Sequence, residues 1–445
     1  MVEADEVYLP LEVVTREYAG KLLLALELAN KGFRVILGHK EPVKKLAMNA
    51  PRPGVFFFKS VPRVGDACFE AIRKLGFVTV VQDEEAGVAY ADFGRFYELR
   101  PHLQRFNEHD AFFCWGLDDY DFLRCRHVDH AHKLFLTGSP RGFLWSKREN
   151  ALLANETESF RRRYGRYILF VGNFVLTNSA RGDEHEVLSA YQRAVGPAVP
   201  VEIMRSDIDL DRRLRRVFVQ AAREVCKALQ LSVVIRPHPV EDWKNWQHEM
   251  NGCDGIHVET GGDLLSLIRA AEAVVQNGCT SAIESRLAGV PVFALAESEA
   301  DIQDRWCGTF ANLIAKHAFG TEALIKLLRD RQNVWAAFVA EVPDSVLDKK
   351  VLRSPEGAPR AIANVISTLA FPARKSMGRK GMRSVNGIRK GKDGSRPSKL
   401  VQNKRREITL EAISSDIGRA SSLLALERDF RVEPVATCCF AISAP

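Results

Sequence analysis

The chain has 445 residues, of which 46% are hydrophobic and 27% are charged, and its formal net charge is +7. This length and composition predict two or three globular domains and exclude a fibrous or wholly disordered protein. The charge is unevenly distributed, because residues 372–445 carry 16 Lys/Arg and 7 Asp/Glu whereas residues 1–371 carry 47 and 49. The basic balance therefore belongs to the C-terminal part, and the near-neutral remainder gives no reason to expect nucleic-acid binding.

Two features indicate the cellular compartment. The N-terminus is acidic and lacks the apolar run of a secretory signal, and no stretch approaches the roughly 18 apolar residues of a membrane-spanning helix. The nine cysteines are scattered without a C-x-x-C pair, which is typical of reduced thiols. We therefore expect a cytoplasmic protein.

The first forty residues predict a strand, a helix and a second strand, over Val7–Glu12, Glu17–Lys31 and Phe33–Gly38. This order is typical of a parallel sheet with a crossover helix. The alternation continues and ends in a linker helix at Ala151–Arg163, which predicts an N-terminal Rossmann-like domain over residues 1–165. Its further strands are expected at Val55–Phe58, Val78–Val81, Ala111–Trp115 and Leu134–Leu136.

A second alternation predicts another Rossmann-like domain over residues 166–335. Two doubly wound α/β domains in series face each other across a cleft, where the carboxyl ends of both sheets meet and ligands bind. Residues 336–371 are expected to be helical, and a helix is also expected over His317–Arg329. The strands are expected at Tyr167–Val171, Ser232–Arg236, Ile256–Val258, Ala273–Gln276 and Pro291–Ala294.

The last part of the chain, residues 372–445, is predicted to be a disordered basic tail. Residues 374–406 contain 13 basic residues and one acidic one, with no apolar period. Aromatic residues do not interleave with these cations, which argues against nucleic-acid binding. Such a segment suits peripheral contact with an anionic membrane, and an extension without function is an equal alternative.

The strand at Ser232–Arg236 runs directly into a stiff turn, Arg236-Pro-His-Pro239. Two prolines fix the backbone there, so Arg236 and His238 are held at the carboxyl edge of the sheet. A guanidinium and an imidazole at that edge suit a phosphate or carboxylate. The alternative is an ordinary strand-ending turn with a surface histidine.

A second junction follows the strand Ala273–Gln276. Asn277 and Gly278 lead into a helix that opens with Thr280 and Ser281, so backbone amides and the helix dipole are expected to face a phosphate. Glu284 lies one turn further and can accept hydrogen bonds from a ribose diol. The alternative is structural, because Ser281-x-x-Glu284 is also a capping box.

These two junctions carry a resemblance to the nucleotide-binding half of GT-B glycosyltransferases. The similarity is to enzymes with a His-Pro motif that use CMP-activated acidic sugars or CDP-glycerol, and it rests on IRPHP at 235–239 and VVQNGCTSAIESRLAGVPVFAL at 274–295. Four further stretches resemble the bacterial surface carbohydrate biosynthesis protein family: YLPLEVVTREYAGKLLLALELANKGFRVILG at 8–38, VVQDEEAG at 80–87, LTGSPR at 136–141 and YILFVGNF at 167–174.

The resemblance extends from residue 7 to about 370 and implies a nucleotide-sugar donor on the second domain. It implies that His238 and the Ser281 region contact the donor's phosphate and nucleotide, and that Glu284 contacts the ribose. Ser139 stands where an Asn or His is expected. The resemblance identifies neither a nucleophile nor a base.

Carboxylates at the opposite side of the cleft are the candidate catalytic groups. Glycosyl transfer needs a base for the acceptor hydroxyl or a carboxylate nucleophile. Glu12 and Glu17 flank the first strand-to-helix junction and Glu85 follows another strand, although carboxylates in a first helical turn also simply favour its dipole. Arg16 and Asn173 are expected to line the cleft. No metal site is expected, because the spacing of His127, Asp129, His130 and His132 fits no zinc motif.

The sequence therefore predicts a glycosyltransferase that moves a sugar from a nucleotide-sugar donor to a surface polysaccharide or glycolipid, without a bound cofactor. A nucleotide-sugar 2-epimerase, which acts without an acceptor, is one alternative. A non-catalytic nucleotide-sugar-binding protein of surface carbohydrate biosynthesis is the other.

Overall fold

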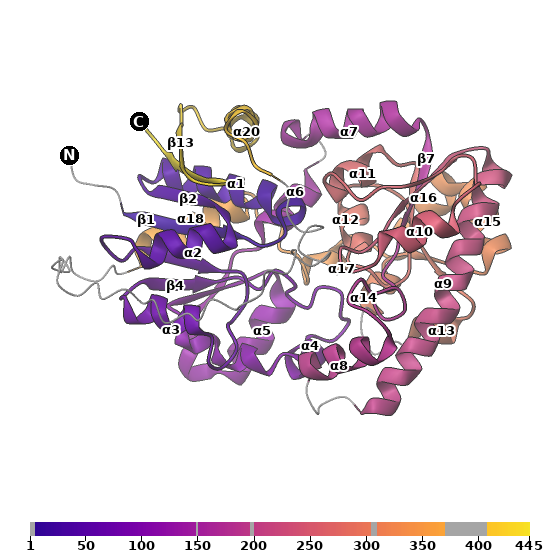
Figure 1. Ribbon diagram of the computed structural model, residues 1–445, viewed down its shortest axis with the longest axis horizontal. Helices are drawn as coiled ribbons and strands as arrows, with labels where there is room; N and C mark the ends of the chain where they lie inside the picture. Colours follow the sequence, from indigo (N-terminus) through magenta and orange to yellow (C-terminus); the bar gives the residue numbers. More distant parts are fainter. Residues whose placement is uncertain (1–4, 148–149, 196–199, 304–308, 370–406) are drawn as a thin grey trace.

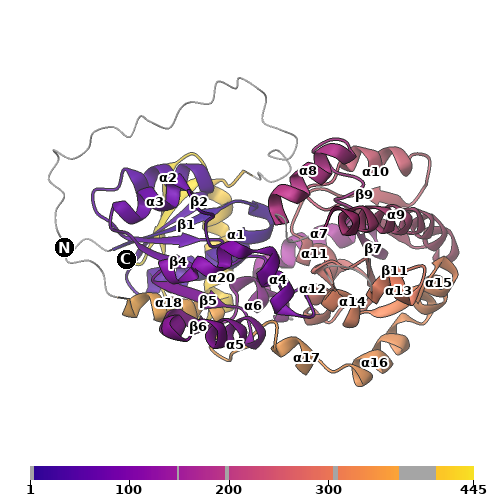
Figure 2. The same cartoon turned by 90° about the horizontal axis from the view of Figure 1, so that it is seen from below.

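The computed structural model describes residues 5–147, 150–195, 200–303, 309–369 and 407–445. Figure 1 shows two α/β bodies side by side, joined through α7 (Ala151–Tyr164), and Figure 2 shows the same pair from below. This confirms the predicted α/β class with two parallel-sheet bodies. The predicted strands are confirmed within two residues at each end.

The first body is built on an eight-stranded sheet of order β13-β14-β2-β1-β3-β4-β5-β6. Its central strands are parallel, and they are buried on both faces: Val7 and Leu9 of β1 belong to one hydrophobic core, and Tyr8 belongs to another. The strands are β1 (Glu6–Leu11), β2 (Arg34–His39), β3 (Val55–Phe58), β4 (Val78–Val81), β5 (Ala111–Cys114), β6 (Leu134–Leu136), β13 (Arg431–Ala436) and β14 (Cys439–Ser443).

Helices precede, connect and follow these strands. Two of them are capped by an aspartate side chain: Asp66 caps α3 through the N–H groups of Cys68 and Phe69, and Asp92 caps α4 through the N–H of Gly94. The helices of this body are α1 (Val14–Asn30), α2 (Lys40–Met48), α3 (Ala67–Lys74), α4 (Phe93–Leu99), α5 (Leu117–Arg126), α6 (Pro140–Ser146), α18 (Ala358–Thr368) and α20 (Leu410–Leu424), with 3-10 helices η1 (Pro101–Glu108) and η2 (Val128–Lys133).

The second body is built on a six-stranded, fully parallel sheet of order β12-β11-β10-β7-β8-β9. Numbered within this body, the order is 3-2-1-4-5-6 of the Rossmann arrangement, and it reverses between β7 and β10. The strands are β7 (Tyr167–Val171), β8 (Ser232–Arg236), β9 (Ile256–Val258), β10 (Ala273–Gln276), β11 (Val292–Ala296) and β12 (Lys316–Phe319). The helices are α8 (Glu184–Val195), α9 (Val201–Leu229), α10 (Trp243–Glu249), α11 (Leu264–Ala270), α12 (Ser281–Leu287), α13 (Glu299–Gln303), α14 (Thr309–Leu313), α15 (Thr321–Arg329), α16 (Arg331–Glu341) and α17 (Ser345–Asp348).

The helix predicted over His317–Arg329 is wrong in its first part. Residues Lys316–Phe319 form β12, which pairs with β11, and the helix begins only at Thr321 after Gly320 with φ of 84°. β12 is one of the two edge strands of its sheet, and only Ala318 in it is buried. A strand with so little apolar content leaves no alternating pattern in the sequence.

The prediction of disorder for residues 372–445 is wrong for residues 407–445. They form α20 and the antiparallel hairpin β13–β14, and β14 extends the first sheet by pairing with β2. Gly38 of β2 permits this pairing, since a Cβ there would lie 2.4 Å from the Cys438 carbonyl oxygen. The cationic stretch 374–406, predicted to be disordered, with membrane contact and an extension without function as equal alternatives, lies outside the described residues.

Two further findings concern the helices. Helix α18, predicted as part of a separate helical region over 336–371, packs against α1 and α6 of the first body. Within the described ranges, no helix combines the length and the apolar character that crossing a membrane requires.

Candidate functional site

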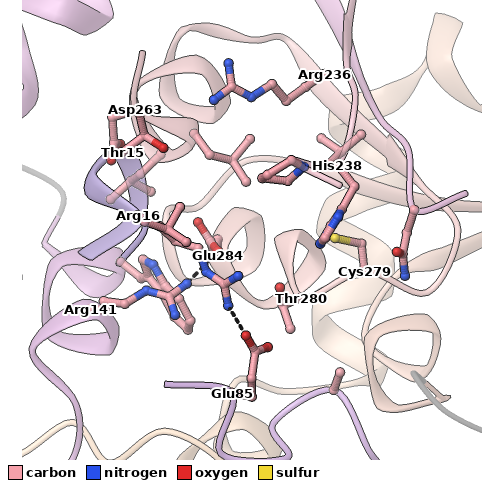
Figure 3. A pocket seen from close by; sticks show the side chains of 18 of the residues that line it. Thr15, Arg16, Glu85, Arg141, Arg236, His238, Asp263, Cys279, Thr280 and Glu284 are labelled. Atoms are coloured by element: carbon pink, nitrogen blue, oxygen red, sulfur yellow. Dashed lines mark hydrogen bonds and ion pairs between the residues drawn. The ribbon is translucent and has the colours of Figure 1, made fainter. Parts of the chain in front are cut away.

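A cavity of about 260 Å³ lies between the two bodies, at the carboxyl edges of both sheets. Residues after β7, β8 and β10 line it from the second body, and residues after β1 and β4 and in α6 line it from the first. In the second sheet this is the point where the strand order reverses, which is where ligands of open α/β sheets bind. Figure 3 shows the lining side chains from both bodies converging on this space.

The turn after β8 presents His238 to the cavity. The buried carboxylate of Glu241 shapes this turn: its Oε1 accepts the N–H groups of His238 at 3.1 Å and Phe174 at 3.0 Å, and its Oε2 accepts the Trp246 indole N–H at 2.7 Å. Burial raises the pKa of Glu241. Glu241 therefore ties the turn after β8 to the loop after β7.

The geometry of His238 determines its tautomer. Its Nδ1 accepts the N–H of Val240 at 3.3 Å, so the neutral ring carries its proton on Nε2. A neutral imidazole in this state donates a hydrogen bond from Nε2, which suits an anionic oxygen.

Arg236 also lines the cavity, but its guanidinium is hydrogen-bonded to the loop after β9. It donates to the carbonyl oxygens of Gly262 at 2.9 Å, of Glu259 at 3.4 Å and of Gly261. The side chain is buried, and these contacts hold the loop that leads into α11. Arg236 thus orients the wall of the cavity next to Asp263.

The junction after β10 differs from the expected phosphate loop. The side-chain oxygen of Gln276 accepts the N–H groups of Gly278 at 2.5 Å and Cys279 at 2.8 Å, so these two amides are already used inside the protein. Gly278 has φ of 88°, a conformation that glycine adopts without strain, and it lines the cavity with Thr280.

Two residues predicted at this junction lie outside the cavity lining. Asn277 is buried and its Oδ1 accepts the N–H of Asn173 at 3.0 Å, which fixes the cavity-lining loop after β7. Ser281 is fully buried as the first residue of α12. The capping box considered for Ser281 and Glu284 does not form, because α12 has no side-chain cap and Glu284 points to the cavity.

Glu284 meets Arg141 from the first body, at 3.5 Å. The Arg141 side chain is 7% exposed, lies near the rings of Trp115 and Trp145, and donates to the carbonyl oxygen of Glu84 at 3.1 Å. Burial raises the pKa of Glu284, although Arg141 opposes this shift. Arg141 and Glu284 therefore link the two bodies across the cavity floor (Figure 3).

Arg16 and Glu85 form a second pair at the cavity, 2.9 Å apart, as drawn in Figure 3. The positive charge of Arg16 lowers the pKa of Glu85 to about 2, despite the opposing effect of burial. A carboxylate stabilised in this way is a weak base. The pair supplies a guanidinium to the cavity from the first body.

The other two predicted catalytic carboxylates lie outside the cavity lining. Glu17 is buried, and it accepts the N–H groups of Glu12 at 3.0 Å and Val13 at 3.1 Å and contacts Lys21 at 3.1 Å. Glu12 pairs with Lys40 at 2.8 Å and with Lys59 at 2.9 Å. Burial would raise the pKa of Glu12, but these two lysines lower it to about 2. Both carboxylates stabilise the start of α1 and its surroundings.

Asp263 also lines the cavity, and its pKa is shifted in the opposite direction to those of Glu12 and Glu85. Burial, reinforced by the negative charge of Glu156, raises its pKa to about 7. One carboxylate oxygen caps α11 by accepting the N–H of Ser266 at 3.1 Å. A carboxyl group with a pKa near neutrality can exchange a proton at physiological pH.

The structure thus brings eight predicted residues to one cavity: Arg16, Glu85, Asn173, Arg236, His238, Gly278, Thr280 and Glu284. Arg141, Asp263 and Glu241 were not predicted. In the sequence, Asp263 follows two glycines as an ordinary helix cap, and nothing local signals that Glu156 of α7 lies close enough to shift its pKa. Among the described residues, no group of three or more His, Cys, Asp or Glu side chains is arranged to hold a metal ion.

Among solved structures, the wall teichoic acid polymerase TagF, in a variant soaked with CDPG, matches with a TM-score of 0.51 and 12% identity over 82% of this chain and 87% of that chain. The chain has the GT-B fold. A UDP-GlcNAc 2-epimerase from Methanocaldococcus jannaschii, in complex with UDP-GlcNAc and UDP, matches with a TM-score of 0.42 and 14% identity over 79% and 81% of the two chains. No protein-family model and no curated protein matches the sequence.

Proposed function

We propose that the chain is a glycosyltransferase that binds a nucleotide-sugar donor in this cavity and transfers the sugar to a hydroxyl of a surface polysaccharide or glycolipid. The observation that carries the proposal is the position of the cavity, at the strand-order reversal of the second sheet and closed by cationic side chains of the first body. The GT-B fold is shared with TagF, a polymerase whose structure was determined with CDPG.

The donor's nucleotide fits against the second body, beside Asn173, Gly278 and Thr280. Its phosphate fits between the Nε2 side of His238 and Arg16 on the first body, because both groups donate hydrogen bonds to anionic oxygens. The leaving phosphate gains negative charge during transfer, so donors at this place favour the transition state. Glu284 remains the proposed partner of the ribose.

A nucleotide-sugar 2-epimerase is the second candidate. It is favoured by two carboxyl groups of raised pKa, Asp263 and Glu284, which line the same cavity. An epimerase removes and returns a proton at one carbon, so it needs acid and base groups around that carbon. Incubation with CMP-, CDP-, UDP- and GDP-sugars in the absence of acceptor separates the two functions, because only an epimerase produces an altered nucleotide sugar.

The donor site is tested by replacing His238. We expect His238→Ala to weaken nucleotide binding about tenfold or more, since hydrogen bonds to charged groups contribute about 1.5–3 kcal/mol. Thermal-shift titration with CMP, CDP, UDP and GDP measures this, because a nucleotide that binds the folded state raises its stability.

The matched control is His248→Ala, an exposed histidine of α10 outside the cavity, which should bind like the unmodified protein. Equal nucleotide affinity in His238→Ala and His248→Ala would refute the assigned donor site. A chain that binds none of these nucleotides, nor their sugars, would refute the proposed function itself.

A further inference from the structure

A second cavity, of about 390 Å³, adjoins the first one. It lies between α1, α7 and the C-terminal segment 407–445, and Figure 1 shows α20 beside α1 and α7. The two cavities share four lining residues. These are Thr15, Ala19, Leu153 and Asp263. These four residues form the boundary between the two cavities.

The walls of this second cavity combine apolar surface with hydrogen-bonding groups. Leu152, Leu153 and Ile408 supply the apolar part. The hydroxyl of Tyr18 donates to Asp416 of α20 at 2.9 Å, so the C-terminal segment is bonded to α1 at this wall. A sugar ring has hydroxyl groups at its edge and C–H groups on its faces, and such a mixed surface accommodates both.

The charged groups of the cavity restrict its ligand further. Among the residues that the structure describes, four carboxylates line it, and the single guanidinium in that lining, Arg419, is paired with Asp416. Carboxylates accept hydrogen bonds from hydroxyl groups and repel phosphate or carboxylate groups. The four carboxylates belong to Glu156, Asp263, Glu407 and Asp416.

We propose that this second cavity is the acceptor site, that it takes an uncharged, hydroxyl-rich glycan end, and that Asp263 at its junction with the donor cavity is the catalytic base. The proposal rests on the glycosyltransferase function proposed above. It also assigns a role to the C-terminal segment, which supplies one wall of the acceptor site.

Asp263 is placed for this step because it lines both cavities. The acceptor O–H gives its proton to the Asp263 carboxylate, and the acceptor oxygen forms a bond to the anomeric carbon of the donor sugar. The bond between that carbon and the donor phosphate oxygen breaks, and its electron pair leaves with the nucleotide. The raised pKa of Asp263, about 7 through burial and the charge of Glu156, gives it the basicity that this proton transfer needs.

The acceptor site is tested by saturation-transfer NMR on the full chain, with methyl glycosides of glucose, galactose and N-acetylglucosamine and with their 6-phosphates. We expect binding of at least one neutral glycoside and at least a fivefold weaker signal from its 6-phosphate. Asp416→Ala and Tyr18→Phe should each weaken neutral-glycoside binding several-fold. The control is Glu411→Gln, an exposed carboxylate of the same helix that does not line the cavity.

Nucleotide affinity is measured on the same variants and should change less than about twofold. Neutral and phosphorylated glycosides that bind equally, or binding that is equal in Asp416→Ala and Glu411→Gln, would overturn the acceptor assignment.

The base is tested with Asp263→Asn, which keeps an oxygen that can cap α11. We expect transfer to acceptor to fall at least a hundredfold while nucleotide affinity stays within about threefold. Transfer at the normal rate in Asp263→Asn would exclude Asp263 as the base and leave the glycosyltransferase function standing. Absence of nucleotide binding in the unmodified chain would instead remove the proposed function.

Discussion

The carboxylates around the cleft fall into two groups that differ in their immediate surroundings. Glu12, Glu17 and Glu85 each lie beside a cation, which lowers their pKa values and makes them poor bases. Asp263 is half-buried and Glu284 is buried, and in both the removal from water outweighs the nearby positive charges, so their pKa values are raised. The cations beside Glu12 and Glu85 come from distant parts of the chain, whereas Glu17 pairs with Lys21 four residues further on. Residue type and position after a strand therefore do not reveal the difference.

The protonation of Asp263 also makes stability depend on pH. Glu156 and Glu284 raise its pKa and Arg236 lowers it, with burial as the largest effect, so the folded value is about 7 against an ordinary 3.8. The folded state therefore binds more protons than the unfolded state between these values. The contribution of Asp263 to stability falls as pH rises from about 4 to about 7, and it stays low above that.

We expect Asp263→Asn to remove the loss of folding stability that ionisation of Asp263 causes as pH rises. Its melting temperature should match that of the unmodified chain near pH 4.5 and exceed it by a few degrees at pH 8, measured by differential scanning fluorimetry. Asp242→Asn is the control, because Asp242 likewise caps a helix, α10, through the N–H of Lys244. If Asp263→Asn melted at a lower temperature than the unmodified chain at pH 8, ionised Asp263 would instead stabilise the fold.

At the scale of elements, the C-terminal segment is part of the first body. Ile413 and Ile417 of α20 and Phe440 and Ile442 of β14 lie in its main hydrophobic core. The outer strand β13 is largely exposed and contains Pro434, which cannot donate to another strand, so the new sheet edge is protected from further pairing. The sequence prediction missed this short unit because it relied on the composition of the whole tail. In that average, the many cations of residues 374–406 outweigh the apolar stretch Cys439–Ile442.

Because the C-terminal segment 407–445 packs into the core of the first body, truncating its buried side chains should destabilise the whole fold. We expect Ile442→Ala to lower the free energy of unfolding by about 3 kcal/mol, since the side chain is fully buried. Urea unfolding followed by tryptophan fluorescence measures the change. Glu433→Ala in the same hairpin should cost less than about 0.5 kcal/mol, because its ion pair with Arg34 is long and exposed. Equal, small effects would mean that the hairpin is not stably docked.

At the scale of the whole molecule, the cavity exists only because two sheets point their carboxyl edges at each other. The first body contributes Arg16, Glu85 and Arg141, and the second contributes His238, Thr280 and Glu284. Since residues 1–371 carry a net charge near zero, the donor phosphate that we propose depends on these local groups and not on a general positive field.

A ligand in this cavity should therefore protect backbone amides of both bodies from hydrogen exchange. We expect a bound nucleotide to slow amide hydrogen exchange in the loops at residues 12–17, 84–90 and 237–241, with no change in β13 at the far edge of the first sheet. Mass-spectrometric exchange with and without saturating nucleotide measures this. Protection confined to the second body would contradict a donor site formed by both.

The sequence by itself determined the two parallel α/β bodies, the described strands other than β12, β13 and β14, and the two junctions that carry Arg236, His238, Thr280 and Glu284. These follow from local information, because hydrophobic period, turn residues and the rule that parallel strands share one edge act over short stretches. The tertiary structure alone decided which side chains are available. Arg16 pairs with Glu85, Lys40 and Lys59 pair with Glu12, and burial together with the charge of Glu156 on α7 raises the pKa of Asp263. Hydrogen-bond partners and burial depend on residues distant in the chain, so they became visible only when the two bodies and the C-terminal segment came together.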